Sequence, residues 1–174
     1  ADGFALNFNA DALESDFIVN LPVMKAHNQT MVSLGIKKLK GLIDIPSRKR
    51  CHSMEPGRDL HVWVSLLAER MPPMFTLLDG IYTNERGPGF DGRVHRADIL
   101  AASADVLAAD LVGAALLGYA PGEVPHLRHA ALRRGRPLDL SDIEVAGESV
   151  AALARRHEHD FHYRATPEAE LPLP

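Results

Sequence analysis

Apolar residues gather in short runs that predict four strands. Runs bounded by glycine, proline or charged residues occupy four segments: 17–21, 75–82, 98–102 and 143–147. Short continuous apolar runs of this kind are typical of strands buried in a sheet. The run at 98–102 is apolar throughout after its first residue, which is the pattern of a strand covered on both faces.

Longer segments repeat their apolar positions every three or four residues, which is the period of an amphipathic helix. This spacing predicts helices in four segments: 29–34, 60–70, 103–117 and 124–134. Ser103 is a suitable N-cap for the third of these helices. Gly118 and Gly135 stand where the last two helices end, as glycine commonly does.

The alternation of strands and helices predicts an α/β fold, with a mixed or parallel sheet and helices packed on it. A chain of 174 residues has the size of a single domain, which we assign to residues 1–154. Residues 155–174 are rich in Arg, His, Glu and Pro. That composition predicts a loosely packed tail, available for contacts in an oligomer.

Composition argues against several classes of function. The formal net charge of −4 argues against nucleic-acid binding, which usually requires a basic face. The one cysteine, Cys51, excludes an internal disulfide and an iron–sulfur cluster held by thiolates of this chain. The most apolar segment, 99–120, contains Asp105 and Asp110, so it predicts a buried helix and argues against a membrane span.

The start of the chain indicates a processed product or a fragment of a longer protein, because it begins at Ala1 and has no signal-type apolar stretch. A single cysteine and the absence of an expected span lead us to expect a cytoplasmic protein.

Positive charge is concentrated in residues 25–58. This segment holds eight Lys or Arg residues and two acids, so its formal charge is +6 within a chain of net charge −4. His27 and His52 lie in the same segment. A local excess of cations in an acidic protein indicates a site for an anion, and we expect the chemistry of the protein to lie here.

The first candidate pair is Lys25 and His27, which follow the predicted strand 17–21. Residues just past the C-terminal end of a strand line the ligand crevice of open α/β sheets, and residues two apart in an extended chain face the same side. Lys25 would bind a carboxylate or phosphate, and His27 would transfer a proton or bind a metal. The alternative is a solvated lysine beside a structural histidine.

Two further basic motifs follow in the chain. Lys37 and Lys40 lie between two glycines, so backbone amides and ammonium groups can approach an anion together; a solvated basic turn is the alternative. Arg50 and His52 form the other motif. His27 and His52 are also candidate ligands of a divalent metal, although their spacing matches no familiar zinc site.

Four residues outside the basic segment complete the candidate site. Gly87 and Pro88 belong to a Gly-rich loop that would cover a ligand, although such loops are often plain turns. Asp79 stands at the end of an apolar run and would orient the lysines. Asp110 stands in a helix that is apolar nearly all round, where an isolated charge is costly. We expect a lysine of the basic segment to pair with it, either structurally or within the site.

Seven motifs stand in a fixed order along the chain: Asn20-Leu21-Pro22-x-x-Lys25-x-His27, Gly35-Ile36-Lys37-Lys38-Leu39-Lys40-Gly41, Arg50-x-His52, Leu78-Asp79-Gly80, Gly87-Pro88, Ala101-Ala102-Ser103-x-Asp105-x-x-Ala108-x-Asp110 and Gly118-Tyr119. Over residues 16–147 this set resembles the bacterial and archaeal domain-of-unknown-function family 362. Many members of that family carry an added ferredoxin-like iron–sulfur module, which a chain with one cysteine lacks. The resemblance also implies more α/β sequence upstream.

A more distant likeness concerns nickel-pincer lactate racemase. In that enzyme a histidine, a lysine that anchors the cofactor and a ligand histidine follow one another. His27, Lys37 and His52 stand in the same order, and His27 and Lys37 share the spacing of ten residues. This likeness implies a shared ancestral site.

These observations predict a small-molecule enzyme, or an enzyme-like domain, that binds an anionic ligand in a Lys/His pocket at strand ends. Lys25, Lys37 and Lys40 would hold the carboxylate or phosphate, His27 would act as general acid and base, and His52 would be a second base. The alternative is a non-catalytic regulatory domain that docks an acidic partner through the basic segment 25–58.

Overall fold

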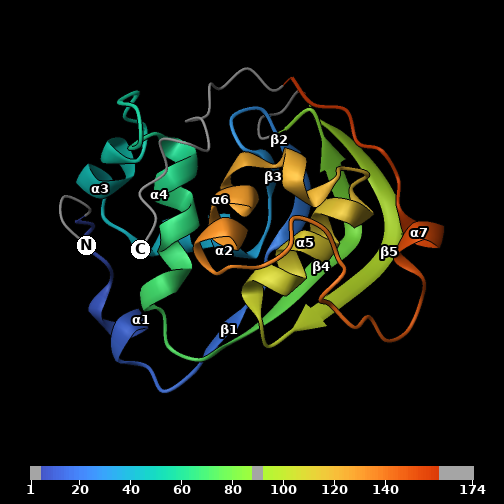
Figure 1. Cartoon of the computed structure of the whole chain (residues 1–174), viewed down its shortest axis with the longest axis horizontal. Coiled ribbons are helices and arrows are strands. Elements are labelled where there is room, and N and C mark those ends of the chain that lie inside the picture. The colour runs from blue at the N-terminus through green and yellow to red at the C-terminus, as the bar shows by residue number, and fades with distance from the viewer. Residues whose placement is uncertain (1–4, 88–91, 161–174) are drawn as a thin grey trace.

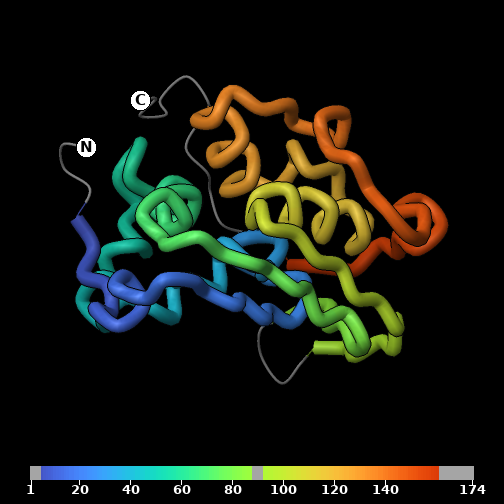
Figure 2. Tube along the Cα trace, turned by 90° about the horizontal axis from the view of Figure 1, so that it is seen from below, coloured from blue at the N-terminus to red at the C-terminus, as the bar shows by residue number. Residues whose placement is uncertain are grey.

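A five-stranded mixed sheet with helices packed on one face forms the body of the protein. The computed structural model describes residues 5–87 and 92–160. Figures 1 and 2 show the helices gathered on one side of the strands. The strands are β1 Ile18–Asn20, β2 Val23–His27, β3 Met31–Ser33, β4 Met74–Glu85 and β5 Arg93–Ser103. The predicted α/β class with a mixed sheet is therefore confirmed.

Strand β4 is the centre of this sheet. β1 and then β2 pair with it in parallel along one side, and β5 pairs with it antiparallel along the other. β3 is antiparallel to β2 and lies at the outer edge. β1 and β2 share one side of β4 because only Leu21 and Pro22 separate them. Lys25 and His27 therefore lie within β2, not in a loop after a strand.

Seven α-helices and three 3-10 helices occur in residues 5–87 and 92–160. Their bounds are α1 Ala10–Glu14, α2 Gly35–Lys38, α3 Ile45–Arg50, α4 Leu60–Leu66, α5 Val106–Leu116, α6 Pro125–Arg133 and α7 Val150–Leu153, with η1 Leu39–Leu42, η2 Leu67–Arg70 and η3 Pro121–Glu123. α5 is apolar nearly all round because it packs against β4, β5, α2 and α6 at once. None of these helices is long and apolar enough to span a bilayer.

Two predicted elements are wrong. Residues 29–34 form a turn and strand β3, not a helix, because Val32 pairs with Ala26 across the sheet and the Thr30 hydroxyl donates to the carbonyl of Val32 at 2.9 Å. Residues 143–147 have no partner strand among the described residues, and they lie beside β5 across a cavity.

The N-cap of α5 also differs from the prediction. The carboxylate of Asp105 accepts the amides of Leu107 and Ala108 at 2.9 and 3.3 Å. Ser103 is the last residue of β5, and its hydroxyl accepts the amide of Asp105 at 3.0 Å. The cap therefore lies two residues later than the pattern indicated.

The first residues of the predicted tail are attached to the domain. His157 is 3% exposed, its carbonyl accepts the Tyr119 hydroxyl, and its imidazole is 2.7 Å from the Thr83 hydroxyl. The carbonyl of Glu158 accepts the amide of Arg86 at 2.9 Å. Loose packing therefore does not describe His157, because its side chain is buried against Thr83 of β4 and His95 of β5. Residues 161–174 lie outside the described residues.

The face of the sheet opposite the helices is apolar and exposed. Val19 and Phe75 are cross-strand neighbours on it, and Leu100 lies beside Asp79. These three apolar side chains are 60%, 38% and 61% exposed. Asp79 therefore stands on the helix-free face of β4, where its carboxylate accepts the amide of Ile81 at 3.1 Å.

Candidate functional site

Five cationic side chains of the basic segment converge on one concavity of about 460 Å³. Within residues 5–87 and 92–160, no carboxylate lines it. We call this concavity the cationic pocket. Its cationic residues come from β2, α2, η1 and α3: Lys25, Lys37, Lys38, Lys40 and Arg48. The sequence analysis placed three of these residues in the site and left out Lys38 and Arg48.

Helix α2 positions the lysines, and a distant carboxylate fixes where it begins. Asp110 of α5 accepts the amide of Gly35 at 2.7 Å and that of Ile36 at 2.8 Å. The first amides of any helix have no partner within the helix, so a carboxylate is well suited to them. Asn20 adds a bond from its side-chain amide to the carbonyl of Gly35 at 3.1 Å. The start of α2 is therefore tied to both α5 and β1.

The partner that we expected for Asp110 was a lysine, and that expectation is wrong. Its carboxylate is fully buried and pairs with two backbone amides, because α5 passes the start of α2 and not the lysine side chains. Burial raises the pKa of Asp110 to about 7, although both amide bonds act in the opposite direction. Asp110 therefore holds the start of the helix that carries Lys37 and Lys38, and it does not line the pocket itself.

Lys37 is the most perturbed cation of the pocket. Burial, together with the charges of Lys40 and Lys25, lowers its pKa to about 8. A lysine with such a pKa has an appreciable neutral fraction near physiological pH, which is what proton transfer or nucleophilic attack by an amine requires. Burial and Arg48 also lower the pKa of Lys40.

His27 is buried and neutral. Its pKa is lowered to about 3, first by burial and then by the nearby lysines. Its Nδ1 accepts the amide of Gln29 at 3.1 Å, so Nε2 carries the proton. A metal on Nε2 would require the proton on Nδ1, where it would face another N–H group. His27 is thus a hydrogen-bond donor, and this geometry does not favour it as a metal ligand.

His52 contacts Lys40 and not His27. Its Nε2 lies 2.6 Å from the Lys40 ammonium, and burial together with Lys40 and Lys37 lowers its pKa. In residues 5–87 and 92–160, no group of three or more His, Cys, Asp or Glu side chains is placed to hold a metal ion. Burial raises the pKa of the neighbouring Cys51, which remains a thiol.

Six predicted site residues are not among those that line the pocket: His27, His52, Arg50, Asp79, Gly87 and Asp110. The guanidinium of Arg50 donates to the carbonyl of Ala5. Asp79 stands on the helix-free face of the sheet, where it pairs with Val23, a residue that does line the pocket. Gly87 is buried and its carbonyl accepts the amide of Asn28 at 3.1 Å, next to His27. Pro88, the other loop residue of the prediction, lies outside the described residues.

Comparison with known proteins shows which family the chain belongs to. Residues 4–115 match the family model described as "Domain of unknown function (DUF362)". The chain belongs to this family. It is also 32% identical, over 123 residues, to the thylakoid-associated protein sll1697 of Synechocystis. That match covers 69% of this chain and 38% of the relative, so the chain spans less than two thirds of the relative's length. No solved structure matches, and neither comparison carries the likeness to nickel-pincer lactate racemase.

The DUF362 match contains the whole cationic pocket and Asp110, but not α6. α6 carries a feature that the sequence analysis assigned no role. His126 is fully buried, neither of its ring nitrogens has a hydrogen-bond partner among the described residues, and its ring stacks on His61 of α4 at a centroid distance of 6.4 Å. Burial lowers its pKa well below the usual value. The sequence signal was a histidine between apolar neighbours in a helix.

Proposed function

We propose that this DUF362 protein binds a small anionic molecule, through a carboxylate or phosphate group, in the cationic pocket, and that it acts on that molecule as an enzyme or enzyme-like domain. The observation that supports this proposal is the convergence of five cations on one concavity that no carboxylate of the described residues lines. Neighbouring cations repel one another, and a partly buried ammonium group loses hydration. A bound oxyanion offsets both costs.

Lys37 is the best candidate for proton transfer in this site. Its pKa of about 8 lies close to physiological pH, whereas the pKa of His27, about 3, keeps that imidazole neutral. The role of general acid and base that the sequence suggested for His27 therefore passes to Lys37. His27 does not line the pocket, and His52 would act through its contact with Lys40.

A second candidate function is docking of an acidic protein through α3. Arg48, Lys49 and Arg50 follow one another in the last turn of this helix. Lys49 and Arg50 are exposed and lie outside the pocket lining, so they would contact a large partner and not a small ligand. The two functions therefore require different lysines.

Calorimetric titration separates the two candidates. Inorganic phosphate, pyrophosphate and a panel of short mono- and dicarboxylates would be titrated into the wild type, Lys37→Met and the matched control Lys49→Met. Loss of one charged contact should weaken binding about tenfold or more in Lys37→Met, with the control within about twofold. Lys37→Met should also abolish turnover of any ligand that the protein converts.

The opposite pattern would contradict the proposal. If no small anion binds, or if Lys37→Met and Lys49→Met weaken binding equally, the pocket is not a small-molecule site. Steep loss of binding with salt in both variants, for an acidic polypeptide probe only, would favour the docking function.

A further inference from the structure

A second site lies along the free edge of β5, independent of the cationic pocket. β5 pairs with β4 along one side, and no described strand pairs with its other side. In an antiparallel ladder, alternate residues direct their N–H and C=O groups away from the partner strand. Along residues 98–103 these outward groups border a cavity of about 450 Å³.

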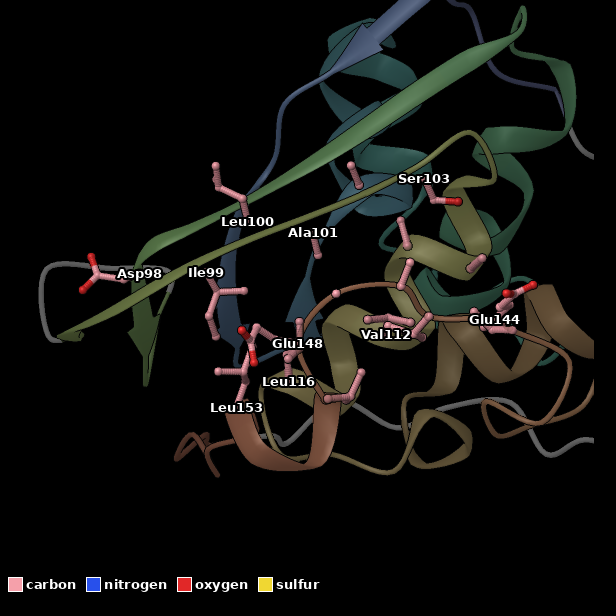
Figure 3. Close-up of a pocket in the computed structure, with 18 residues that line it drawn as sticks. Asp98, Ile99, Leu100, Ala101, Ser103, Val112, Leu116, Glu144, Glu148 and Leu153 are labelled. Carbon is pink, nitrogen blue, oxygen red and sulfur yellow. The ribbon is translucent and has the colours of Figure 1, made fainter.

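The cavity runs along the edge of the strand and not over one face of it. All six residues from Asp98 to Ser103 line it, although successive side chains of a strand point to opposite faces. A cavity that touches both sets must lie beside the backbone. Figure 3 shows β5 on one side, the segment that carries Glu144, Glu148 and Leu153 on the other, and Val112 and Leu116 of α5 between them.

The far wall of this cavity is irregular chain without a ladder. Residues 143–147 have the composition of a strand but form none with any described strand. The amide of Ile143 donates to the carbonyl of Leu140, within the same turn. Unpaired edges are usually covered or blocked in natural proteins. An apolar slot between a free strand edge and a segment that pairs with no described strand is a receptive site for another strand.

The chemistry of the slot defines the occupant. Its floor is apolar, with Ala109, Val112 and Leu116 of α5, and its rim carries Glu144 and Glu148. Among the residues that the structure describes, no Lys, Arg or His lines it. Backbone groups along β5 supply regularly spaced donors and acceptors, which an extended peptide matches and a compact small molecule does not.

We propose that this slot binds an extended peptide segment of a partner protein by strand addition to β5, with apolar side chains directed at α5 and basic residues at Glu144 and Glu148. A second copy of the chain is a poorer occupant. The part of β5 that lines the slot carries Asp98 and no cation. Pairing two copies would therefore bring acids to an acidic rim.

The test is a display selection of random eight-residue peptides on the immobilised full chain. Counter-selection uses Val112→Phe, which fills the slot from α5. The matched control is Val94→Phe, on β5 but outside the slot and 61% exposed. We expect selected peptides to alternate apolar residues between Lys or Arg flanks, and to bind Val94→Phe as they bind the wild type.

Backbone methylation of a selected peptide then tests the mode of binding by fluorescence polarisation. N-methylation should weaken binding about tenfold or more at alternate amides and little at those between them, because alternate amides face β5. The double substitution Glu144→Lys and Glu148→Lys should weaken binding by about tenfold. Both side chains are exposed, so the substitutions should leave the fold intact. Lys37→Met should change nothing, which separates this site from the anion site.

Several outcomes would overturn the inference. One is a selection in which no peptide binds the wild type better than it binds Val112→Phe. Another is a loss of affinity on N-methylation that is the same at every amide of the peptide. Sedimentation that shows wild-type dimers lost on Val112→Phe would assign the slot to a second copy, and amide protection of residues 143–147 in the free protein would assign it to the chain itself.

Discussion

Lys37 connects the chemistry of single residues to the packing behind them. Its side chain lies in the cationic pocket, whereas its backbone belongs to the helix that Asp110 starts. Burial and two neighbouring lysines lower its pKa to about 8. Its proton affinity therefore depends on lysines of its own basic segment, whereas its position depends on Asp110, which is far away in the sequence.

Binding of a dicarboxylate should weaken as pH rises above about 8. Lys37 is protonated below its pKa of about 8 and loses its charge above it, so affinity should fall by up to about tenfold per pH unit. A dicarboxylate is fully ionised in this range, so the ligand contributes no pH dependence of its own. Calorimetry between pH 7 and about 9.5 measures the effect.

The matched variant for this prediction is Lys37→Arg. Arginine remains charged throughout this range, so the decline above pH 8 should disappear even if the affinity is lower. A profile of the same shape in both proteins would show that another group titrates.

Asp110→Ala should destabilise the fold. The substitution leaves the buried amides of Gly35 and Ile36 without an acceptor, at a cost of about 2–4 kcal/mol. Urea unfolding at pH 6 is the best measurement of this cost. The carboxyl group, with a pKa of about 7, is then mostly protonated, so the cost of burying a charge in the wild type does not mask the lost hydrogen bonds. Asp79→Ala is the control, since Asp79 accepts one amide near the surface, and it should cost about 1 kcal/mol or less. Equal costs would contradict the role of Asp110.

At the scale of elements, the junction of α2 with α5 decides whether the cationic pocket forms. α2 has four residues and no side chain of its own that caps it. A helix this short is not stable without outside contacts. The contacts come from Asp110 and Asn20, so two elements far apart in the chain determine where Lys37 and Lys38 point.

Two glycines flank the lysines, and they should respond differently to alanine. A Cβ on Gly35 would lie 2.8 Å from a carboxylate oxygen of Asp110 and 2.9 Å from a Val106 methyl group, whereas a Cβ on Gly41 meets nothing within 4 Å. Overpacking should make Gly35→Ala cost about 1–3 kcal/mol. Gly41→Ala should be neutral or slightly stabilising, by up to about 1 kcal/mol. Thermal and urea unfolding of both variants measure the difference.

Anion binding measures whether the junction of α2 with α5 positions the lysines of the cationic pocket. Gly35→Ala should weaken dicarboxylate binding more than Gly41→Ala, because it moves the start of α2. Full affinity in Gly35→Ala would show that the pocket tolerates a shift of this helix.

At the scale of the whole molecule, residues 155–160 fasten the end of α5 to β4. The amides of Arg155 and His157 donate to the carbonyls of Leu116 and Leu117, each at 3.0 Å. Gly118 lies beneath them with a φ of +80°. This segment crosses from the helix layer to the sheet, so its attachment reports on the packing of both.

Gly118→Ala should detach this segment. Its Cβ would lie 2.5 Å from the Cα of Arg156, whereas the matched position Gly135, with a φ of +61°, has open space around it. Both substitutions carry the left-handed cost of about 1–2 kcal/mol, and Gly118→Ala should cost at least about 1 kcal/mol more. Hydrogen exchange should show faster exchange of the His157 amide in Gly118→Ala alone. Equal exchange in both variants would contradict this account.

The sequence by itself determined the α/β class, strands β1, β4 and β5, the three main helices and the gathering of cations in one segment. These features follow from local patterns, because apolar periodicity selects the element and charges close in sequence stay close in space. It also showed that Asp110 requires a partner, since a buried carboxylate is costly wherever it lies.

Only the tertiary structure decided which groups meet. It paired Asp110 with amides of α2, took Arg50 and Asp79 away from the pocket, added Lys38 and Arg48, and left residues 143–147 without a ladder. Each of these outcomes depends on contacts between segments tens of residues apart. A hydrogen-bond partner or a ladder neighbour is chosen by the packing of whole elements, which no local pattern contains.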